Sequence, residues 1–236
     1  MILTNHGKSL QLRQTKPEDA PILLRAYQDN SFIRLYRSNN AELTEEELAK
    51  MLAERLEHQP TELGYIELMI EHKQHGPIGV AVLGDYTPLH RRAEYLIGLF
   101  EAERRSIGHG TEATLLVLDL AFNHYKLHKI YTYVYEYNEE SEKSTVKFGF
   151  KQEGILEDHH YLMKDKRFVN LYINGMTEER FRNTEQIRRY SQRLLGRDVT
   201  QAPQVIKLTE ENQLPLEAGK KFLEGWLANA NQSDEL

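Results

Sequence analysis

Cysteine is absent from this sequence of 236 residues, tryptophan occurs once, and no apolar run is long enough to cross a membrane. Without cysteine, the chain has no disulfide bond, no thiolate nucleophile and no cysteine-based metal site. This composition suits a reducing compartment, and we expect a cytoplasmic protein. A membrane-spanning helix needs about 20 apolar residues, and the N-terminus lacks the charged-then-apolar order of a secretory signal.

A large excess of either charge is also missing. Lysine and arginine number 30 against 36 acidic residues, which gives a formal net charge of −6. So mild a charge favours solubility and argues against nucleic acid as a partner. The hydrophobic content of 40% is sufficient for a folded core.

Strand and helix patterns alternate along the first 182 residues. Thr15 with Glu18, and Thr44 with Glu47, have the spacing of capping boxes at the starts of two helices. Apolar residues at helical spacing predict a buried helix over Gly110–Tyr125. The full order is a strand, two helices, three strands, a helix, a strand, a helix and a hairpin, which predicts one α/β (α+β) domain. The expected strands are 10–14, 65–72, 77–86, 93–100, 129–137, 158–165 and 168–176, and the last helix is 139–148.

Two glycines, Gly108 and Gly110, stand between an expected strand and the apolar helix. Glycine lets a backbone approach a ligand closely, and the free amides of a helix N-terminus attract anions such as pyrophosphate. The same glycines would also suit a tight turn with no ligand. A dinucleotide fingerprint is excluded because its third glycine is missing, and a Walker loop because its Gly-Lys pair is missing.

A family resemblance favours the ligand-binding interpretation. The stretch Arg105–Gly110 resembles the R/Q-x-x-G-x-G/A signature of the GNAT superfamily of acyl-CoA-dependent N-acetyltransferases. The continuation Thr111–Ala113 is similar to the ribosomal-protein-alanine acetyltransferase branch. That branch also has an N-x-x-S…K-x-G-F-x-x-E-G segment. The residues matching it here are Asn138, Ser141, Lys147, Gly149, Phe150, Glu153 and Gly154, and the likeness as a whole runs from about residue 10 to residue 182.

The resemblance implies a mixed central sheet with splayed central strands, flanked by helices, and acetyl-CoA as the acyl donor without a metal. Backbone groups of Gly98, Leu99 and Phe100 would pair with the pantetheine arm, and Asn138 would contact the thiol end. The amides that would bind the pyrophosphate belong to Arg105, Ser106, Ile107, Gly108, His109 and Gly110.

The expected reaction is direct attack of an amine on the thioester, which requires positioning and proton transfer. Glu94, on the central strand, is the candidate general base, acting through water. Many members of the superfamily have a tyrosine as the acid, but Thr145 stands at that position here. Ser141 is then the candidate acid, and water or the proton of the ammonium are alternatives.

The expected acceptor is a primary amine, either a protein N-terminus or a small molecule such as an amino sugar, polyamine or antibiotic. The alternative function is a catalytically weak acyl-CoA-binding module that docks a partner through its tail. Alternate tyrosines share one face of a strand, which would form a packing ladder, an aromatic wall of the acceptor cleft or a dimer seam. These tyrosines are Tyr131, Tyr133, Tyr135 and Tyr137.

Residues 183–236 lie outside the resemblance and are expected to form a helical extension of the domain at 1–182. The stretch 184–198 is basic and helix-prone, and 216–230 has an amphipathic pattern that includes Trp226. Such a tail could cover the protein's own core, form a homodimer or contact a partner.

Overall fold

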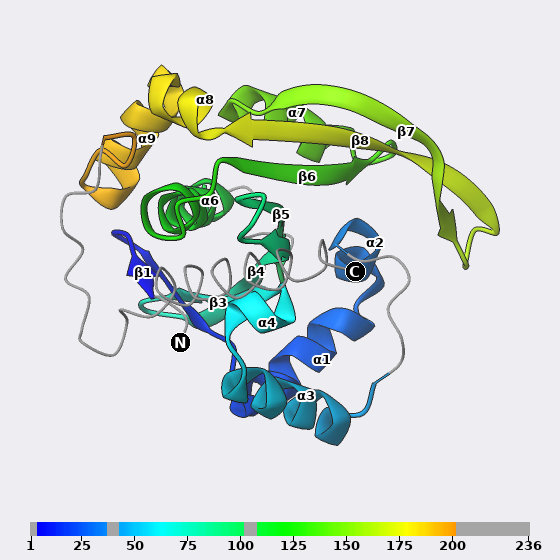
Figure 1. The fold of residues 1–236 in the computed structure, drawn as a ribbon. Helices are drawn as coiled ribbons and strands as arrows, with labels where there is room; N and C mark the ends of the chain where they lie inside the picture. The colour runs from blue at the N-terminus through cyan, green and yellow to red at the C-terminus, as the bar shows by residue number, and fades with distance from the viewer. Residues whose placement is uncertain (1–3, 37–42, 102–107, 202–236) are drawn as a thin grey trace, which may run out of the picture.

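The computed structural model describes residues 4–36, 43–101 and 108–201. Within them, eight strands form one sheet in the order β1-β2-β3-β4-β5-β6-β8-β7, shown in Figure 1. The strands are β1 Asn5–His6, β2 Leu10–Gln14, β3 Ile66–His72, β4 Gly76–Thr87, β5 Arg92–Leu99, β6 Lys129–Tyr135, β7 Lys151–Leu162 and β8 Arg167–Thr177.

The centre of the sheet separates where β5 meets β6. All other strand pairs are antiparallel, whereas β5 and β6 are parallel and pair only over Arg92–Glu94 and Lys129–Tyr131. Beyond Glu94 the two strands diverge and share no further ladder partners. The predicted mixed sheet with splayed central strands is therefore confirmed.

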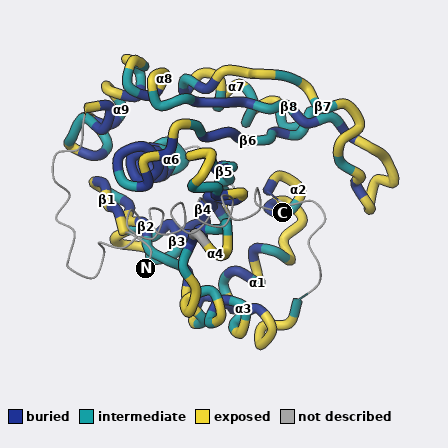
Figure 2. The backbone as a smooth tube through the Cα atoms, viewed as in Figure 1, coloured by how far each residue is buried: buried dark blue, intermediate teal, exposed yellow. Residues whose placement is uncertain are grey.

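Helices cover both faces of the β2–β5 half of the sheet. One face packs against α6, which is buried from Glu112 to Asp119 except at Thr114, and against α9; α6 is largely dark blue in Figure 2. The opposite face of β3–β5 packs against α1, α2 and α3 through Met69, Val80 and Val82. The helices are α1 Ala20–Gln28, α2 Asn30–Tyr36, α3 Glu45–Glu57, α4 Pro60–Leu63, α6 His109–Asp119, α7 Glu139–Phe148, α8 Glu178–Asn183 and α9 Glu185–Leu195.

Two helix starts test the expected capping boxes. At α3 the box is confirmed, because Glu47 N donates to Thr44 Oγ1 at 3.2 Å and Thr44 N donates to Glu47 Oε2 at 2.8 Å. At the first helix the predicted box is wrong by one residue. There Lys16 N donates to Asp19 Oδ2 at 2.9 Å, and a 3-10 turn over Pro17–Asp19 leads into α1.

Other boundaries also differ from the prediction. The helix expected to end at Tyr125 leaves α geometry after Asp119 and continues as a π-helical turn, Leu120–His124. The strand expected at 158–165 begins earlier, at Lys151. Its first part was missed because two bulges interrupt the alternation of its side chains. The sequence pattern did not reveal the short elements β1, α2 and α4.

The far end of α6 rests on a buried polar cluster. Asp119 is 3% exposed and accepts hydrogen bonds from Asn5 Nδ2 (3.1 Å), Asn123 Nδ2 (2.7 Å) and Arg197 Nη2 (2.8 Å). The π-helical turn brings Asn123 to the same place, where its amide also donates to the Val199 carbonyl at 2.9 Å. The cluster thereby joins the first strand, α6 and the segment after α9.

The described part of the tail packs on the protein's own core. Ile187, Leu195 and Val199 belong to the same apolar cluster as α6. The division at residue 182 stays a prediction, and the expected amphipathic helix at 216–230 lies outside the described residues. None of the helices in the described ranges combines the length and the apolarity that crossing a bilayer would require.

Candidate active site

A cavity of about 370 Å³ lies in the gap where β5 and β6 diverge. This volume is within the usual range for small-molecule and cofactor sites. The cavity brings together residues from β5, α6, β6 and α7. Those from the predicted site are Gly98, Leu99, Gly110, Asn138 and Ser141, and Tyr133 lines it as well.

The N-terminus of α6 opens towards this cavity. Gly108 precedes the helix in the left-handed region, with φ of 87°, a conformation that strongly favours glycine. Gly110 has no such need, because the nearest described atom to an added Cβ is Leu99 Cδ1 at 4.0 Å. Space is thus left beside the first backbone N–H groups of α6, which have no acceptor within the helix. Arg105, Ser106 and Ile107 lie outside the described residues.

His109, the first residue of α6, stands in a group of imidazoles. Its ring lies 5.2 Å from that of His72, which stacks on His75 at 4.5 Å. Nδ1 of His109 is buried without a described hydrogen-bond partner. Across the described ranges, no group of three or more histidine, aspartate or glutamate side chains has an arrangement that could hold a metal ion.

Gly98 is required by packing. A Cβ there would lie 2.5 Å from Phe32 Cε2, so the ring from α2 rests directly on the strand backbone. Phe100 packs on the same ring at 5.7 Å, and its amide donates to the Ile78 carbonyl at 2.9 Å. Leu99 pairs with Gly79 on the β4 side. Because β6 has diverged, no described strand pairs with the other edge of Gly98 and Leu99.

The start of α7 forms the opposite wall. Asn138 is the N-cap, and its Oδ1 accepts from Ser141 N at 3.3 Å. Ser141 and Thr145 both line the cavity. The helix is tied to the sheet by Asn174, which is fully buried and donates to Glu142 Oε2 at 2.7 Å.

Glu94 lies at the point of divergence, opposite Tyr131 of β6. It shares a sheet face with Leu96 and Gly98, which alternate with it along β5. Its charge contributes to the raised pKa of Tyr133, for which burial is the larger cause. Glu94 therefore faces the same side of the sheet as Tyr133, a residue of the cavity wall.

The face of β6 that carries Tyr131, Tyr133 and Tyr135 is here named the tyrosine face. Tyr131 and Tyr133 meet edge to face at 5.6 Å, and Tyr135 stacks on Tyr137 at 5.1 Å, so the predicted shared face is confirmed. Two histidines of β7 join this face. In a regular strand, adjacent residues such as these point to opposite faces. A bulge before His160 lets His159 approach Tyr133 at 6.4 Å while His160 contacts Tyr135 at 5.4 Å.

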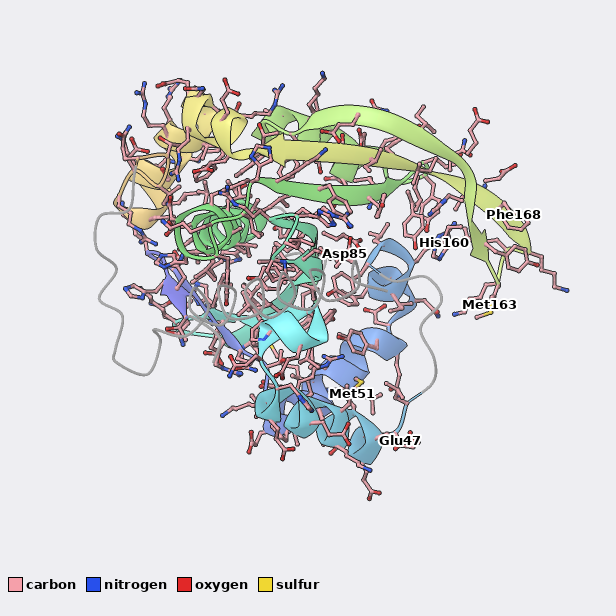
Figure 3. All side chains as sticks on the ribbon, viewed as in Figure 1. Glu47, Met51, Asp85, His160, Met163 and Phe168 are labelled. Atoms are coloured by element: carbon pink, nitrogen blue, oxygen red, sulfur yellow. The ribbon has the colours of Figure 1, made fainter. Side chains whose placement is uncertain are left out.

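The sequence analysis missed an acidic group on this face. Asp85, labelled in Figure 3, sits in a bulge of β4. Its Oδ2 accepts from the Tyr131 hydroxyl at 2.5 Å and pairs with Arg92 Nη1 at 2.9 Å. The pKa of Tyr131 is raised by burial first and by this hydrogen bond second. The one available signal was the Gly84-Asp85 pair inside an otherwise apolar strand, which is typical of a bulge.

The tyrosine face also meets the tip of the β7–β8 hairpin and α2. The Tyr137 hydroxyl donates to the Arg34 carbonyl at 2.8 Å, and the Arg34 guanidinium lies 5.2 Å from the Tyr137 ring. Arg34 also pairs with Asp165 at 3.5 Å, and Lys164 donates to Asn30. These exposed contacts link the hairpin to the helix that contributes Phe32 to the cavity wall.

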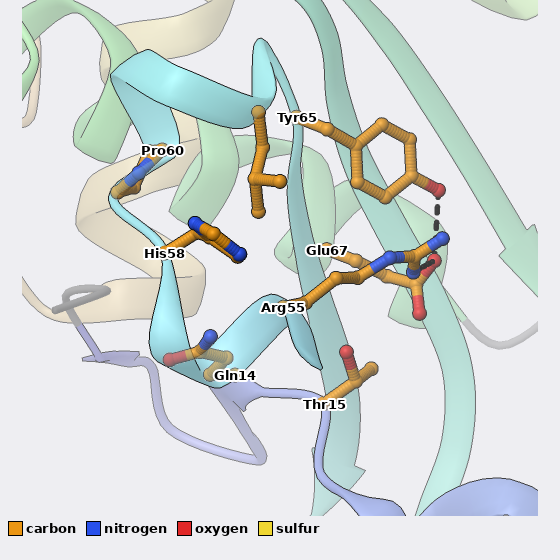
Figure 4. A pocket seen from close by; sticks show the side chains of 8 residues that line it. Gln14, Thr15, Arg55, His58, Pro60, Tyr65 and Glu67 are labelled. Atoms are coloured by element: carbon orange, nitrogen blue, oxygen red, sulfur yellow. Dashed lines mark hydrogen bonds and ion pairs between the residues drawn. The ribbon is translucent and has the colours of Figure 1, made fainter. Parts of the chain in front are cut away.

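A second, smaller hollow lies under α3 and α4 and is drawn in Figure 4. Its volume of about 10 Å³ accommodates a single water molecule. Oε2 of Glu67 accepts from Tyr65 at 2.8 Å and from Arg55 at 3.1 Å, and Oε1 is buried without a described partner. A water molecule in the hollow would donate a hydrogen bond to that oxygen. We therefore give this hollow a structural role rather than a catalytic one.

Comparisons with known proteins agree with this geometry. The sequence profile described as an acetyltransferase (GNAT) domain matches residues 9–151, more than half of the chain. Comparison with curated proteins returns no match.

Solved structures share the fold. A spermidine N-acetyltransferase from Vibrio cholerae in complex with CoA and spermine is 21% identical with a TM-score of 0.65, over 73% of this chain and 97% of that chain. A candidate acetyltransferase from T. thermophilus is 23% identical with a TM-score of 0.65, over 82% and 97%. A dodecameric spermidine N-acetyltransferase from Vibrio cholerae is 22% identical with a TM-score of 0.63, over 74% and 97%. At these identities the likeness shows the fold.

Proposed function

Because this chain belongs to the family of GNAT acetyltransferases, which use acetyl-CoA, we propose that it transfers the acetyl group to a primary amine by direct attack on the thioester. The observation that carries the proposal is the cavity of about 370 Å³ between the diverging strands. It is bounded by the start of α6 at one end and by the tyrosine face at the other. A non-catalytic acyl-CoA-binding module is not favoured, because the family is one of transferases.

The donor occupies the α6 side of the cavity in this proposal. Its pyrophosphate binds the amides of residues 105–110, where the room beside Gly110 allows close approach. Its pantetheine arm pairs with backbone groups of Gly98, Leu99 and Phe100. Asn138 contacts the thiol end with the amide group that does not cap α7.

Proton transfer is assigned to two side chains. Glu94, through water, takes a proton from the acceptor ammonium, which frees the lone pair for attack. Ser141 hydrogen-bonds the leaving sulfur and relays a proton to it. Thr145 also lines the cavity and offers a second hydroxyl in the position where many relatives have tyrosine.

The acceptor in this proposal is a small cationic amine. Two carboxylates, Asp85 and Glu94, and the rings of Tyr131 and Tyr133 lie on the face where the acceptor would enter, and such a surface favours cations. The two spermidine acetyltransferases of the same fold make polyamines the first acceptors to test. A protein N-terminus, the acceptor of the ribosomal-protein-alanine branch, stays the alternative, and a cytoplasmic location stays a prediction.

The test is release of free CoA thiol from acetyl-CoA with a panel of amines. The panel contains a polyamine, an amino sugar and a peptide with N-terminal alanine. We expect turnover with the polyamine, and Glu94→Gln to lower kcat by about 10²- to 10⁴-fold. The Kd for acetyl-CoA should not change, because Glu94 lies outside the donor-binding wall.

Glu157→Gln serves as the matched control, since it removes an exposed strand carboxylate from β7. It should behave as the unaltered protein. Tight acetyl-CoA binding with no turnover on any amine would contradict the proposal. Full activity of Glu94→Gln would instead remove Glu94 from its assigned role and leave the transferase assignment intact.

A further inference from the structure

Asp85 has an uncommon backbone conformation. Its φ is 44°, in the left-handed region that few residues other than glycine adopt. It lies where the pairing of β4 with β5 shifts register, between Gly84 and Thr87. Conformations of this kind cost free energy and persist where the surroundings hold them, often at functional sites. The bulge directs the Asp85 carboxylate across β5 to β6, where it reaches Tyr131.

The two oxygens of this carboxylate have different surroundings. Tyr131 and Arg92 both contact Oδ2, at 2.5 Å and 2.9 Å. The only described contact of Oδ1 is a 3.5 Å approach of the Thr87 hydroxyl. A carboxylate has about four acceptor positions, and this side chain is 46% exposed. Oδ1 thus has the capacity to accept a hydrogen bond from a bound molecule.

The position of Asp85 relates it to the reacting groups. Gly84 on β4 pairs with Glu94 on β5, and Glu94 pairs with Tyr131 on β6. Asp85 is the next residue along β4 after the one that pairs with the candidate base. The charges of Glu94 and Asp85 both raise the pKa of Tyr133, after the larger effect of burial, and Tyr133 lines the cavity. Neighbouring strands are about 4.8 Å apart and residues advance about 3.4 Å along a strand. The backbone positions of Asp85 and Glu94 are therefore about 6 Å apart, which is comparable to the length of a short aliphatic diamine.

The surroundings of Asp85 favour a cation at Oδ1. Arg92 pairs with Oδ2 at 2.9 Å, and no described basic side chain contacts Oδ1. Arg92 also lies against the Tyr131 ring, 5.6 Å from its centre. The ring faces of Tyr131 and Tyr133 add attraction for a cation. Because Asp85 already pairs the charge of Arg92, an acceptor carboxylate would have to compete with Asp85 for it.

We infer that Oδ1 of Asp85 binds a second cationic group of the acceptor, so that the enzyme selects diamines and polyamines over monoamines. This inference rests on the proposed function and adds a specificity-determining residue to it. The reacting amine lies beside Glu94, and the distal ammonium donates to Asp85. Tyr131 and Arg92 hold the carboxylate in place from its other oxygen.

The experiment compares three acceptors of similar length, putrescine, butylamine and γ-aminobutyrate, with acetyl-CoA as the donor. For the unaltered protein we expect kcat/KM to be at least about 10-fold higher for putrescine than for butylamine, since a charge-assisted hydrogen bond contributes about 1.5–3 kcal/mol. Asp85→Asn should raise KM for putrescine by a similar factor and leave both kcat and the butylamine constants unchanged. Asparagine tolerates the left-handed conformation and has nearly the same shape, so the substitution removes the charge and replaces one acceptor oxygen by an NH2 donor without a change of size.

Asp158→Asn is the matched control. Asp158 also has a positive φ, 47°, in a bulge of a strand, but it lies on β7 and its amide donates to Asn170 Oδ1. It should change none of the constants. The Kd for acetyl-CoA, measured for each variant, shows whether the protein is folded and the donor site intact.

Three results would overturn the inference. In the first, Asp85→Asn lowers activity equally on putrescine and butylamine, which would make the residue a structural support of the bulge. In the second, γ-aminobutyrate is the best acceptor, which would mean that Arg92 binds an anionic group of the acceptor at this position. In the third, the unaltered protein turns over butylamine and putrescine equally well. Absence of turnover on every amine would overturn the proposed function and this inference together, whereas the first three results leave the proposed function standing.

Discussion

The two faces of the sheet are supported by different kinds of contact. On the α6 face, Asp119, Asn5 and Asn123 are buried, Arg197 completes their cluster with its side chain 29% exposed, and the apolar core is continuous. On the tyrosine face, the hairpin tip meets α2 through exposed ion pairs such as Arg34 with Asp165. Exposed pairs contribute little to stability, whereas removing one partner of a buried charge pair is costly. The donor side is thus rigidly supported and the acceptor side is open to adjustment.

The same contrast extends to the groups that would bind each substrate. The proposed donor side offers mainly backbone, namely the start of α6 and the part of β5 beyond its ladder with β6. The acceptor side offers side chains that register brings together from β4, β5 and β6. A site made of backbone groups depends on glycines and helix N-termini, so the fold itself determines its shape. A side-chain site can change its acceptor by single substitutions while the fold stays the same.

The largest expected effect is on the support of the α6 face. Asp119→Ala leaves Arg197 and Asn5 without their buried partner, and should lower the free energy of unfolding by about 3–5 kcal/mol. The counterpart on the tyrosine face, Asp165→Ala, should cost less than about 1 kcal/mol. Urea denaturation followed by circular dichroism measures both. Equal losses from the two variants would remove the contrast between the faces.

The next effect concerns the charge at the donor site. Gly108→Asp and Gly108→Asn both place a side chain that tolerates positive φ in front of α6. Only the aspartate would repel a pyrophosphate, and we expect it to weaken acetyl-CoA binding on the order of 100-fold, as measured by calorimetry. The asparagine variant should lose only a few-fold. Gly196→Asp, at another positive-φ glycine after α9, controls for charge elsewhere on the protein. If Gly108→Asn is as defective as Gly108→Asp, backbone geometry rather than charge dominates the site.

A smaller effect is expected where the donor wall meets α2. Gly98→Ala would place a Cβ 2.5 Å from the buried ring of Phe32, and relieving this contact should cost about 1–3 kcal/mol of stability. Gly84→Ala is the matched control on the neighbouring strand, since its nearest contact would be Val82 Cγ1 at 3.7 Å. Thermal unfolding of the two variants gives the comparison. A stable Gly98→Ala protein would mean that α2 can move away from the cavity wall.

The smallest effect is a pH dependence at the far end of α6. Burial lowers the pKa of His124, with smaller contributions of both signs from Asp119, Lys126 and Arg197. The unfolded chain therefore binds the proton more tightly than the folded protein does. Above the unfolded-state pKa of about 6.5, His124 is neutral in both states and does not reduce the free energy of unfolding. As the pH falls from that pKa towards the lower folded-state pKa, the free energy of unfolding decreases.

His124→Gln should make the free energy of unfolding less dependent on pH between neutral and mildly acidic solution. His90→Gln, an exposed histidine near the turn before β5, should leave the dependence as it is. The measurement is a series of urea titrations at stepwise lower pH. A variant with the slope of the unaltered protein would show that His124 does not contribute.

The proposed donor half of the site could be located from sequence because it depends on short local patterns. Gly108 and the apolar helix behind it are adjacent in the chain, and the family signature spans the same few residues. The splay of β5 from β6 followed from the same resemblance. Asp85 could not be predicted in this way. Its approach to Tyr131 depends on a bulge and on a strand register that joins positions 46 residues apart in the sequence.

Errors in the predicted elements have a common physical cause. The expected cap at Thr15 failed because Asp19 accepts from Lys16 N and also pairs with Arg13, while the Thr15 amide donates to the Glu67 carbonyl at 3.3 Å. The two bulges in β7 broke the alternation by which strands are recognised, so its first half was missed. In each case a tertiary contact overrode a local pattern.

The anchoring of α6 sets the limit for shortening the chain. A protein cut at residue 182, where the family resemblance stops, would leave Asp119 without Arg197 and would uncover the apolar surface beneath Ile187 and Val199. A protein cut after Gln201 would keep both, together with the carbonyl that Arg182 holds at 3.1 Å. For expression or crystallisation, the C-terminal boundary of the shortest stable fragment therefore falls after α9, well beyond the end of the recognisable motif.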